Sequence, residues 1–341
     1  MKITSRKLLN RTGLIGIADR LLANSVCSKN TVVILGFWRS GTTYLLELLE
    51  QTLRARTVFE PFHEAVPAAR KYHQDAQFLT PRGPVTQMYP YIPAHSDRSD
   101  LDQFLYSILT GQVSNRWTRR NRAPGNLLST KLLVKLVRGN LIAGYLSRRF
   151  GVKIIMIVRH PAAVIASIIR SPGGDKALQA VLGDASFEQV LPGDSVHADH
   201  PELWPQIKID NADVVSRIAR IHALLHILPL SQNEGEEGKM HICTYEGLLL
   251  DQERELKRMN TFLAADPGET WSLKALKKPS STTKAERIKI STQARCTGWK
   301  QELTADQIKN IDLVVSSAGG HYAELIRSIE VMGMGGHAQK T

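Results

Sequence analysis

The stretch Gly36-Phe37-Trp38-Arg39-Ser40-Gly41-Thr42-Thr43-Tyr44 determines how the rest of the chain can be interpreted. A β-branched apolar run at 31–35 precedes it, and a run typical of a helix at 45–50 follows it. A strand, a glycine-bearing turn and a helix form the context in which a phosphate-binding loop is credible. Glycines let the backbone approach an anion closely, and a helix start supplies free N–H groups. The stretch therefore predicts a binding loop for a phosphoryl or sulfuryl group.

The spacing of Gly36 and Gly41 matches the loop of P-loop NTPases, but the next residue differs. An NTPase loop has lysine there, and this chain has Thr42, while the positive charge lies inside the loop at Arg39. No clear strand ends in an acidic residue suited to holding Mg²⁺. A small-molecule kinase or another P-loop nucleotide-binding enzyme is therefore disfavoured, and it is kept as the alternative that magnesium-dependent ATP binding would support.

Composition indicates a globular protein with an anionic partner. The chain has 341 residues, 43% hydrophobic and 22% charged, enough to form a large core without disulfides or metals. Its net charge of +12 favours an anionic ligand, polymer or membrane surface. A polyanion-binding module ranks last, because no nucleic-acid motif is visible and the basic residues are spread along the chain. The three cysteines lie far apart without metal spacing, which indicates a reducing compartment and predicts a cytoplasmic protein.

Residues 1–30 are predicted to form an N-terminal amphipathic helix. Basic and apolar residues alternate through 1–25, and Asn10-Arg11-Thr12 interrupts the apolar core that a signal peptide needs. No apolar stretch approaches the roughly 20 residues of a membrane span. Such a helix can contact anionic lipid at the membrane periphery or pack on the domain, and packing is the commoner case in globular folds.

Strands and helices alternate along the rest of the chain, which predicts a three-layer α/β/α fold with a central parallel sheet, like that of P-loop NTPases. The predicted strands are 32–35, 56–59, 132–137, 153–158 and 240–244, and the predicted helices are 42–53, 101–109, 139–150, 162–170, 212–228, 251–263 and 304–318. We expect one domain over 31–331, with irregular insertions at 72–128 and 171–206 and a disordered tail at 332–341.

Two further groups follow strands of this sheet. Ligands of open α/β sheets bind beyond the carboxyl ends of the strands, so Glu60 is expected on the same edge as the loop. Arg159 leaves a later strand at that edge, and Ser167 lies two turns into the next helix. An arginine fork and a hydroxyl suit a phosphate. Two anion sites on one edge predict a nucleotide with phosphates at both ends.

Three motifs in combination resemble the sulfotransferases that use 3′-phosphoadenylyl sulfate (PAPS). They are Gly-x-x-Arg-Ser-Gly-Thr-Thr at 36–43, Phe-Glu-Pro-Phe-His at 59–63, and Ile-Val-Arg-His-Pro at 157–161 with Ser167 eight residues after Arg159. Thr-Tyr-Glu-Gly-Leu at 244–248 and Gly-Trp-Lys-x-x-Leu-Thr at 298–304 are similar to later landmarks of that family. The resemblance covers roughly residues 31–330, and its Glu-Pro form looks most like the carbohydrate-acting and bacterial branches.

The resemblance implies sulfuryl transfer from PAPS, as co-substrate and without a metal, to a hydroxyl of a sugar or glycoconjugate such as a glycolipid. Cationic and N–H groups would stabilise charge on the leaving phosphate, which suits the loop. Arg159 and Ser167 would hold the 3′-phosphate, and Trp299 would join the nucleotide site. The residues that would hold the 5′-phosphosulfate are Arg39, Ser40, Gly41, Thr42 and Thr43.

Glu60 is the hypothesis for the general base that takes a proton from the acceptor hydroxyl. It can instead be a structural carboxylate paired with Arg39 or another basic residue. His63 and Glu64 are the other candidates for the base. Lys135, on a neighbouring strand, can reach the bridging oxygen of the donor or point into the flank of the sheet.

Several other residues have open roles. The family's basic C-terminal loop is not matched cleanly at 292–299, so Arg287, Lys289 and Arg295 are alternative contacts to the 3′-phosphate. His222 and His226 lie four apart on a predicted helix, and a core position is expected for them rather than zinc binding. His197 and His200 are expected to lie in a loop rather than to bind a metal. No metal site is predicted. The aromatic residues that can stack on sugar rings or pack the insertions are Tyr89, Tyr91, Trp117 and Trp204.

Overall fold

A computed structural model describes residues 28–63, 65–70, 89–120, 122–171, 199–201, 213–234, 238–263 and 290–333, with positions 17, 19, 21, 22, 26, 196 and 281. Within them, parallel strands form a sheet of order β2-β3-β1-β4-β5. The strands are β1 (Thr31–Gly36), β2 (Arg56–Phe59), β3 (Leu132–Leu136), β4 (Lys153–Val158) and β5 (Met240–Thr244). The predicted central parallel sheet is confirmed.

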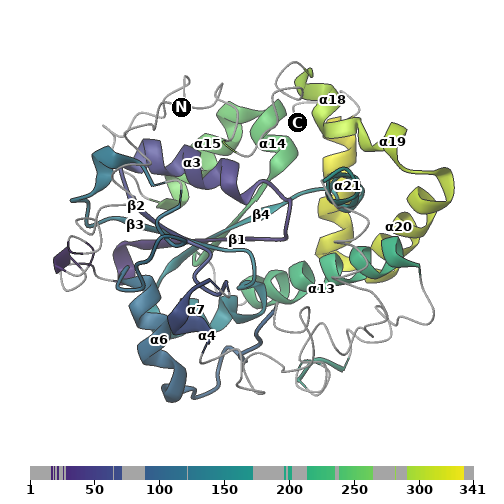
Figure 1. Ribbon diagram of the computed structural model, residues 1–341. Coiled ribbons are helices and arrows are strands. Elements are labelled where there is room, and N and C mark those ends of the chain that lie inside the picture. The colour runs from purple at the N-terminus through teal and green to yellow at the C-terminus, as the bar shows by residue number, and fades with distance from the viewer. Residues whose placement is uncertain are drawn as a thin grey trace.

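Helices cover both faces of the sheet (Figure 1). One face carries α3 (Thr42–Leu53), α14 (Tyr245–Leu250) and α15 (Gln252–Leu263). The other carries α6 (Ser99–Leu109), α7 (Ala143–Phe150) and α13 (Val214–Glu234), with α8 (Pro161–Ile169) packed on α13. The three-layer α/β/α fold is therefore confirmed. Short elements are α4 (Pro67–Arg70), η1 (Ser28–Asn30), η3 (Pro124–Asn126) and η4 (Asn140–Ile142).

The C-terminal part of the chain adds further helices. They are α18 (Thr292–Thr297), α19 (Trp299–Glu302), α20 (Ala305–Ala318) and α21 (Gly320–Gly333). Helices α20 and α21 pack on α13. Helix α20 begins at the predicted cap, because Thr304 and Gln307 form a capping box. Helix α21 was not predicted, and it continues past residue 332, where the sequence predicted a disordered tail; residues 334–341 lie outside the described part.

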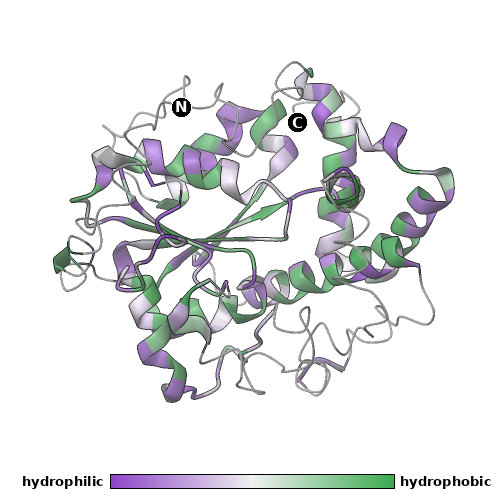
Figure 2. Ribbon diagram, in the orientation of Figure 1, coloured by the Kyte–Doolittle hydropathy of each residue, from purple (hydrophilic) through white to green (hydrophobic). Residues whose placement is uncertain are grey.

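The sheet is buried on both faces because helices cover both, and successive side chains of a strand point into opposite cores. Val33 and Leu35 of β1 join the core under α6, α7 and α13, whereas Val32 and Ile34 join the core under α3 and α15. Hydrophobic residues run along the central strands and along α13 (Figure 2). Burial on both faces explains why the strands of the sheet read as continuous apolar runs.

Helix α13 extends beyond the predicted 212–228 and contains Pro229. A proline in a helix leaves the carbonyl four residues earlier without its usual donor. Here the carbonyl oxygen of Leu225 accepts a hydrogen bond from Asn140 Nδ2 at 3.0 Å. The tertiary contact lets the helix continue. Val214–Gln232 is long and apolar enough to span a membrane, but 72% of that window is buried, as in a core helix.

The N-terminal segment contacts the sheet through Asp19. Its carboxylate accepts hydrogen bonds from Arg56 NH1 at 2.8 Å and Arg122 NH1 at 2.7 Å, and all three side chains are buried. The described helical positions 17 and 21 carry exposed apolar side chains. The Asp19 contacts favour packing on the domain. A full helix over 1–30 and its membrane contact stay predictions, because most of that segment lies outside the described residues.

Candidate active site

The loop between β1 and α3 has the backbone of an anion-binding turn. Arg39 and Gly41 both have left-handed φ angles, 69° and 93°. A Cβ at Gly41 would lie 2.4 Å from the Tyr245 ring, so a larger residue would clash as well as be strained. Gly41 is also the N-cap of α3 and offers no side chain to the first N–H groups of the helix. Those N–H groups can therefore bind an anion.

The loop and the end of β4 contact each other directly. Arg159 NH1 donates to the carbonyl oxygen of Arg39 at 3.1 Å, and Arg39 Nε donates to Ser167 Oγ at 3.2 Å. The Arg159 guanidinium lies 4.5 Å from the centre of the Tyr245 ring, which also packs on Gly41. The two predicted anion sites thus form one continuous group, and Tyr245 joins them. In the sequence, Tyr245 was visible only as part of the 244–248 landmark.

Two polar atoms of this group test whether an anionic ligand fits. Ser40 Oγ and Arg159 Nε are buried, and neither has a hydrogen-bond partner among the described residues. A buried polar atom without a partner costs about 1–3 kcal/mol. A phosphate or sulfate oxygen would supply the missing acceptor, so these residues fit an anion of that kind.

Glu60 and Lys135 meet the other side of the same loop. Lys135 Nζ donates to Glu60 Oε1 at 2.7 Å and to Thr43 Oγ1 at 3.0 Å. It also lies 4.1 Å from the centre of the Phe59 ring, and its side chain is only 3% exposed. Burial lowers the pKa of Lys135, and the charge of Glu60 opposes that change. Lys135 therefore points at the loop rather than into the sheet flank, and Glu60 pairs with it.

A small pocket adjoins this pair. His63 borders it; the His63 ring stacks on Trp117 with the ring centres 3.8 Å apart, and its Nδ1 accepts from the Ala65 N–H at 3.1 Å. Glu64 lies outside the described residues. Arg138 also borders the pocket and was not singled out in the sequence, although a basic residue directly after a predicted strand was a signal. The lining residues are Glu60, Phe62, His63, Leu136, Val137 and Arg138.

His160, the residue after Arg159, is held in place by several contacts. Its Nδ1 accepts from the Ala162 N–H at 3.2 Å, its Nε2 lies 2.9 Å from Glu330 Oε1, and its ring stacks on Trp299. Glu246 Oε1 accepts from the His160 N–H at 3.2 Å, and burial raises the pKa of Glu246 while Arg159 opposes the rise. Trp299 is 7% exposed and packs on His160. Its predicted contact with a nucleotide stays a prediction.

Of the remaining candidates, Arg295 lies near enough to Tyr44 to act on it electrostatically, and Tyr44 contacts the Tyr245 ring. Arg295 Nε donates to the carbonyl oxygen of Ile290 at 3.2 Å, and Arg287 and Lys289 lie outside the described residues, as do His197 and Trp204. Tyr89 and Tyr91 are buried in the core, so packing rather than stacking on sugar is their role in this fold.

The histidine pair of α13 is also a core feature. His226 Nδ1 donates to the carbonyl oxygen of His222 at 2.6 Å, and His222 Nδ1 lies 2.9 Å from the Tyr322 hydroxyl. Both rings are fully buried, and burial lowers the pKa of each. In the described part of the chain no three His, Cys, Asp or Glu side chains group as metal ligands would.

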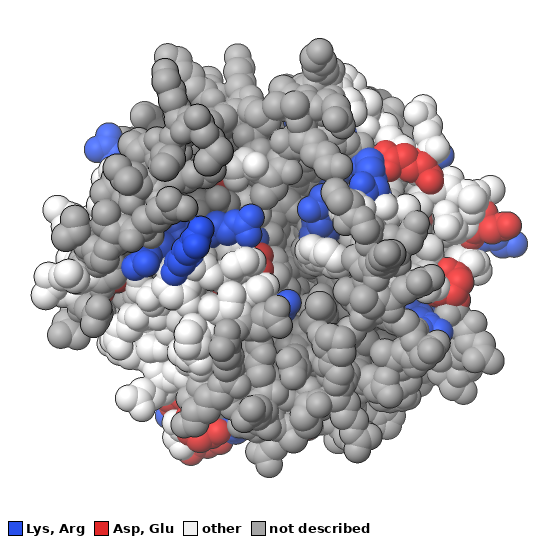
Figure 3. Space-filling view, in the orientation of Figure 1, with Lys and Arg blue, Asp and Glu red and all other residues white. Residues whose placement is uncertain are grey.

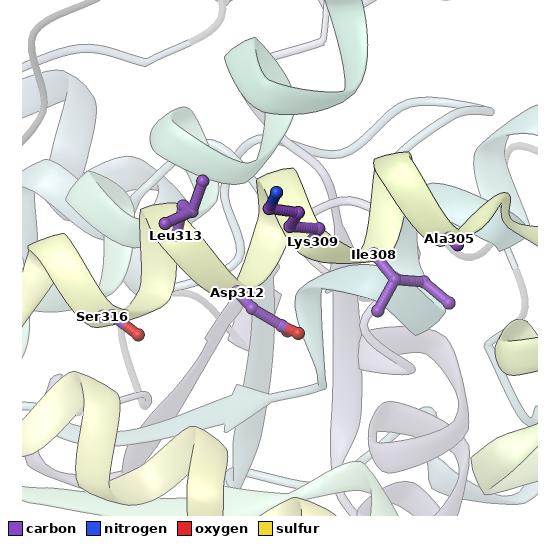
Figure 4. Close-up of a pocket in the computed structure, with 6 residues that line it drawn as sticks. All are labelled: Ala305, Ile308, Lys309, Asp312, Leu313 and Ser316. Carbon is purple, nitrogen blue, oxygen red and sulfur yellow. The ribbon is translucent and has the colours of Figure 1, made fainter.

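Basic and acidic side chains are distributed unevenly on one face of the molecule. On the face seen in Figure 3, Lys and Arg side chains surround the middle, while most Asp and Glu side chains lie toward the periphery. A separate pocket of ≈ 410 Å³ runs along α20 (Figure 4). Its lining residues all come from that helix and include none of the predicted site residues: Ala305, Ile308, Lys309, Asp312, Leu313 and Ser316.

Comparison with known proteins identifies the family. The model described as "Sulfotransferase family" matches residues 31–189, which include the loop, Glu60, Lys135, Arg159 and Ser167. Residues 31–189 thus match the sulfotransferase family. The protein is therefore a sulfotransferase, an enzyme that transfers a sulfuryl group. A comparison of the sequence with curated proteins finds no match.

The sulfotransferase is also similar to several solved structures. Mouse sulfotransferase SULT7A1 complexed with PAP has 13% identity and a TM-score of 0.43, over 95% of this chain and 94% of that chain. The sulfotransferase domain from the curacin biosynthetic pathway has 15% identity and a TM-score of 0.39, over 84% of this chain and 96% of that chain. Retinol dehydratase in a complex with retinol and PAP has 13% identity and a TM-score of 0.39, over 89% of this chain and 85% of that chain.

Proposed function

We propose that this sulfotransferase moves a sulfuryl group from PAPS to a hydroxyl of a sugar or glycoconjugate. The observation that carries the proposal is the loop at 39–43, which contacts Arg159 and Ser167 on one side and the Lys135–Glu60 pair on the other. An anion-binding loop flanked by a second anion site and a carboxylate suits a donor with two charged ends and an acceptor that must lose a proton.

The chain's residues divide the chemistry between them. PAPS, when bound, supplies the sulfuryl group. Its bond from sulfur to the phosphate oxygen breaks as sulfur bonds to the acceptor oxygen. Glu60 takes the proton of the acceptor hydroxyl. Lys135 and Arg39 stabilise the negative charge left on the phosphate, together with the N–H groups at the start of α3. Arg159 and Ser167 hold the 3′-phosphate.

A sugar acceptor is supported by two features beside Glu60. The Glu60-Pro61 pair after β2 has the form found in the carbohydrate-acting and bacterial branches that the sequence resembles. The stacked rings of His63 and Trp117 place aromatic surface at the same edge. We also propose a cytoplasmic location, since Cys243 and Cys296 are buried free thiols, which suits a reducing compartment.

The test combines nucleotide binding with turnover. PAP is the bisphosphate nucleotide that remains when PAPS has given up its sulfuryl group. Titration calorimetry with PAP should give a micromolar Kd, and Arg159→Ala should weaken the binding. PAPS incubated with a panel of sugars and of apolar alcohols should release PAP fastest with a sugar. Absence of PAP binding at micromolar levels would refute the donor, and faster turnover of an apolar alcohol would refute the sugar acceptor.

A further inference from the structure

We infer that the acceptor carries an anionic group next to the hydroxyl that is sulfated, and that Arg138 binds this group. The inference rests on the proposed function, because it concerns the acceptor of the same site. It narrows the acceptor to an acidic compound, such as a sugar with a carboxylate, sulfate or phosphate.

The first argument is the position of Arg138. It follows β3, which ends at Leu136, and so lies at the carboxyl edge of the sheet with the loop and Glu60. Arg138 and Glu60 line the same pocket, together with Phe62, His63, Leu136 and Val137. An acceptor whose hydroxyl reaches Glu60 therefore lies beside the Arg138 side chain.

The second argument is the absence of a counter-charge. Arg138 is half-buried and has neither a hydrogen bond nor an ion pair within the described part of the chain. The carboxylate of this pocket, Glu60, is already bonded to Lys135 at 2.7 Å. Burial raises the pKa of Tyr89, and Arg138 acts on it in the opposite direction, so this neighbour is a neutral phenol and offers no negative charge. Among the residues that the structure describes, the positive charge of Arg138 in this pocket thus has no counter-charge.

The third argument is that the surroundings add positive charge. The Arg120 guanidinium lies 5.2 Å from the centre of the Trp117 ring and 5.8 Å from that of Phe59, next to the His63 stack. Among the described residues of this edge, Glu60 thus faces several cations, and Glu47 acts on Lys135 as well. A neutral acceptor would leave these charges unmatched, whereas an anionic acceptor would be attracted and oriented by them.

Recognition by arginine would also place the reacting hydroxyl. A guanidinium binds a carboxylate or a sulfate through two parallel N–H donors, which fixes orientation as well as distance. With the anion held by Arg138 and the ring against the His63–Trp117 stack, one hydroxyl would face Glu60. Arg138 would therefore select both the acceptor class and the position that is sulfated.

The experiment compares acceptors that differ in one group. Purified enzyme is given PAPS with methyl glucoside, methyl glucuronide, or the 6-sulfate and 6-phosphate of methyl glucoside. We expect kcat/KM to be higher for the acidic acceptors by about 10- to 100-fold, the range of one charge-assisted recognition. The ratio between carboxylate, sulfate and phosphate identifies the anion. Arg138→Gln should bring the acid-to-neutral ratio close to one, and Arg138→Lys should keep part of it.

Matched controls separate this inference from the proposed function. Arg254→Gln removes an exposed arginine on α15 and should leave the acid-to-neutral ratio unchanged. PAP binding by calorimetry should be the same in wild type and Arg138→Gln. An equal rate with neutral and acidic acceptors, or an unchanged ratio in Arg138→Gln, would overturn the inference while the sulfotransfer itself stands. Weaker PAP binding in Arg138→Gln would assign Arg138 to the nucleotide and overturn it too. Failure of the wild type to bind PAP or to release it from PAPS would refute the proposed function and, with it, this inference.

Discussion

Lys135 and Glu60 are joined twice across neighbouring strands. Lys135 Nζ donates to Glu60 Oε1 at 2.7 Å, and the Glu60 N–H donates to the carbonyl oxygen of Lys135 at 3.0 Å. The second bond fixes the backbone of Glu60, whose φ angle of 41° is left-handed. The proposed base is therefore held by the strand that carries the cation, and each partner can be tested separately.

Glu60→Gln should reduce turnover by about 10²- to 10⁴-fold, the usual contribution of a general base. PAP binding should change little, because Glu60 contacts neither Arg159 nor Ser167. Steady-state rates and calorimetry on the same preparation check both points. Turnover close to that of the wild type would move the base to His63, and His63→Asn would then carry the loss.

The pH profile should report on Lys135. Burial lowers the pKa of Lys135 from its usual 10.5, so the ammonium loses its proton at a lower pH than an exposed lysine does. Charge stabilisation by this residue is present below that pKa and is lost as the pH rises through it. Activity should therefore decline on the alkaline side before pH 10.5. In Lys135→Arg the guanidinium stays charged, and the decline should move upward; an unmoved decline would exclude Lys135 as its source.

Arg159→Ala should weaken PAP binding by about 10- to 100-fold, as expected for losing hydrogen bonds to a charged group. It also removes the bond to the Arg39 carbonyl oxygen, so thermal unfolding must be measured alongside calorimetry. Ser167→Ala should have a smaller effect, because a hydroxyl is a neutral partner. Binding that survives Arg159→Ala would mean that the 3′-phosphate is held elsewhere, for instance by Arg295.

Sequence patterns were enough to predict the sheet and the groups at its carboxyl edge, because the end of a strand follows from the local pattern. The direction of Lys135 was not predictable, since it depends on which face of β3 lies under α3. Leu133, two residues earlier, packs in the core beside α3, and the period of two then points Lys135 at Thr43. Arg138 was missed because its interest depends on sharing a pocket with Glu60, which only the tertiary structure shows.

The extent of α13 shows another limit. Pro229 is a helix-ending signal in the sequence, and only the tertiary bond from Asn140 to the Leu225 carbonyl oxygen offsets it. Similarly, Gly319 and Gly320 both have positive φ and read as an end of structure, yet α21 starts there because its apolar face packs on the core.

Asp19→Asn should destabilise the protein by about 3–5 kcal/mol, the cost of breaking a buried ion pair. The change leaves Arg56 and Arg122, both buried, without their shared carboxylate. Urea unfolding followed by circular dichroism measures the effect, and Asp251→Asn on the surface is the matched control. A loss similar to that of the control would mean that the N-terminal segment does not hold these arginines in solution.

Stability should fall in mild acid because of His226. Burial lowers the pKa of His226 from 6.5 to about 4. Between these values the unfolded chain binds a proton that the folded protein does not, so lowering the pH through this window favours unfolding, and below about 4 the effect levels off. His226→Gln removes this proton while its amide can still donate to the His222 carbonyl oxygen. From pH 7 to pH 5 the wild type should therefore lose about 2 kcal/mol more stability than His226→Gln. Replacing His95, an exposed histidine, by glutamine is the control and should follow the wild type; equal pH dependence in all three proteins would show that His226 is not buried in its neutral form.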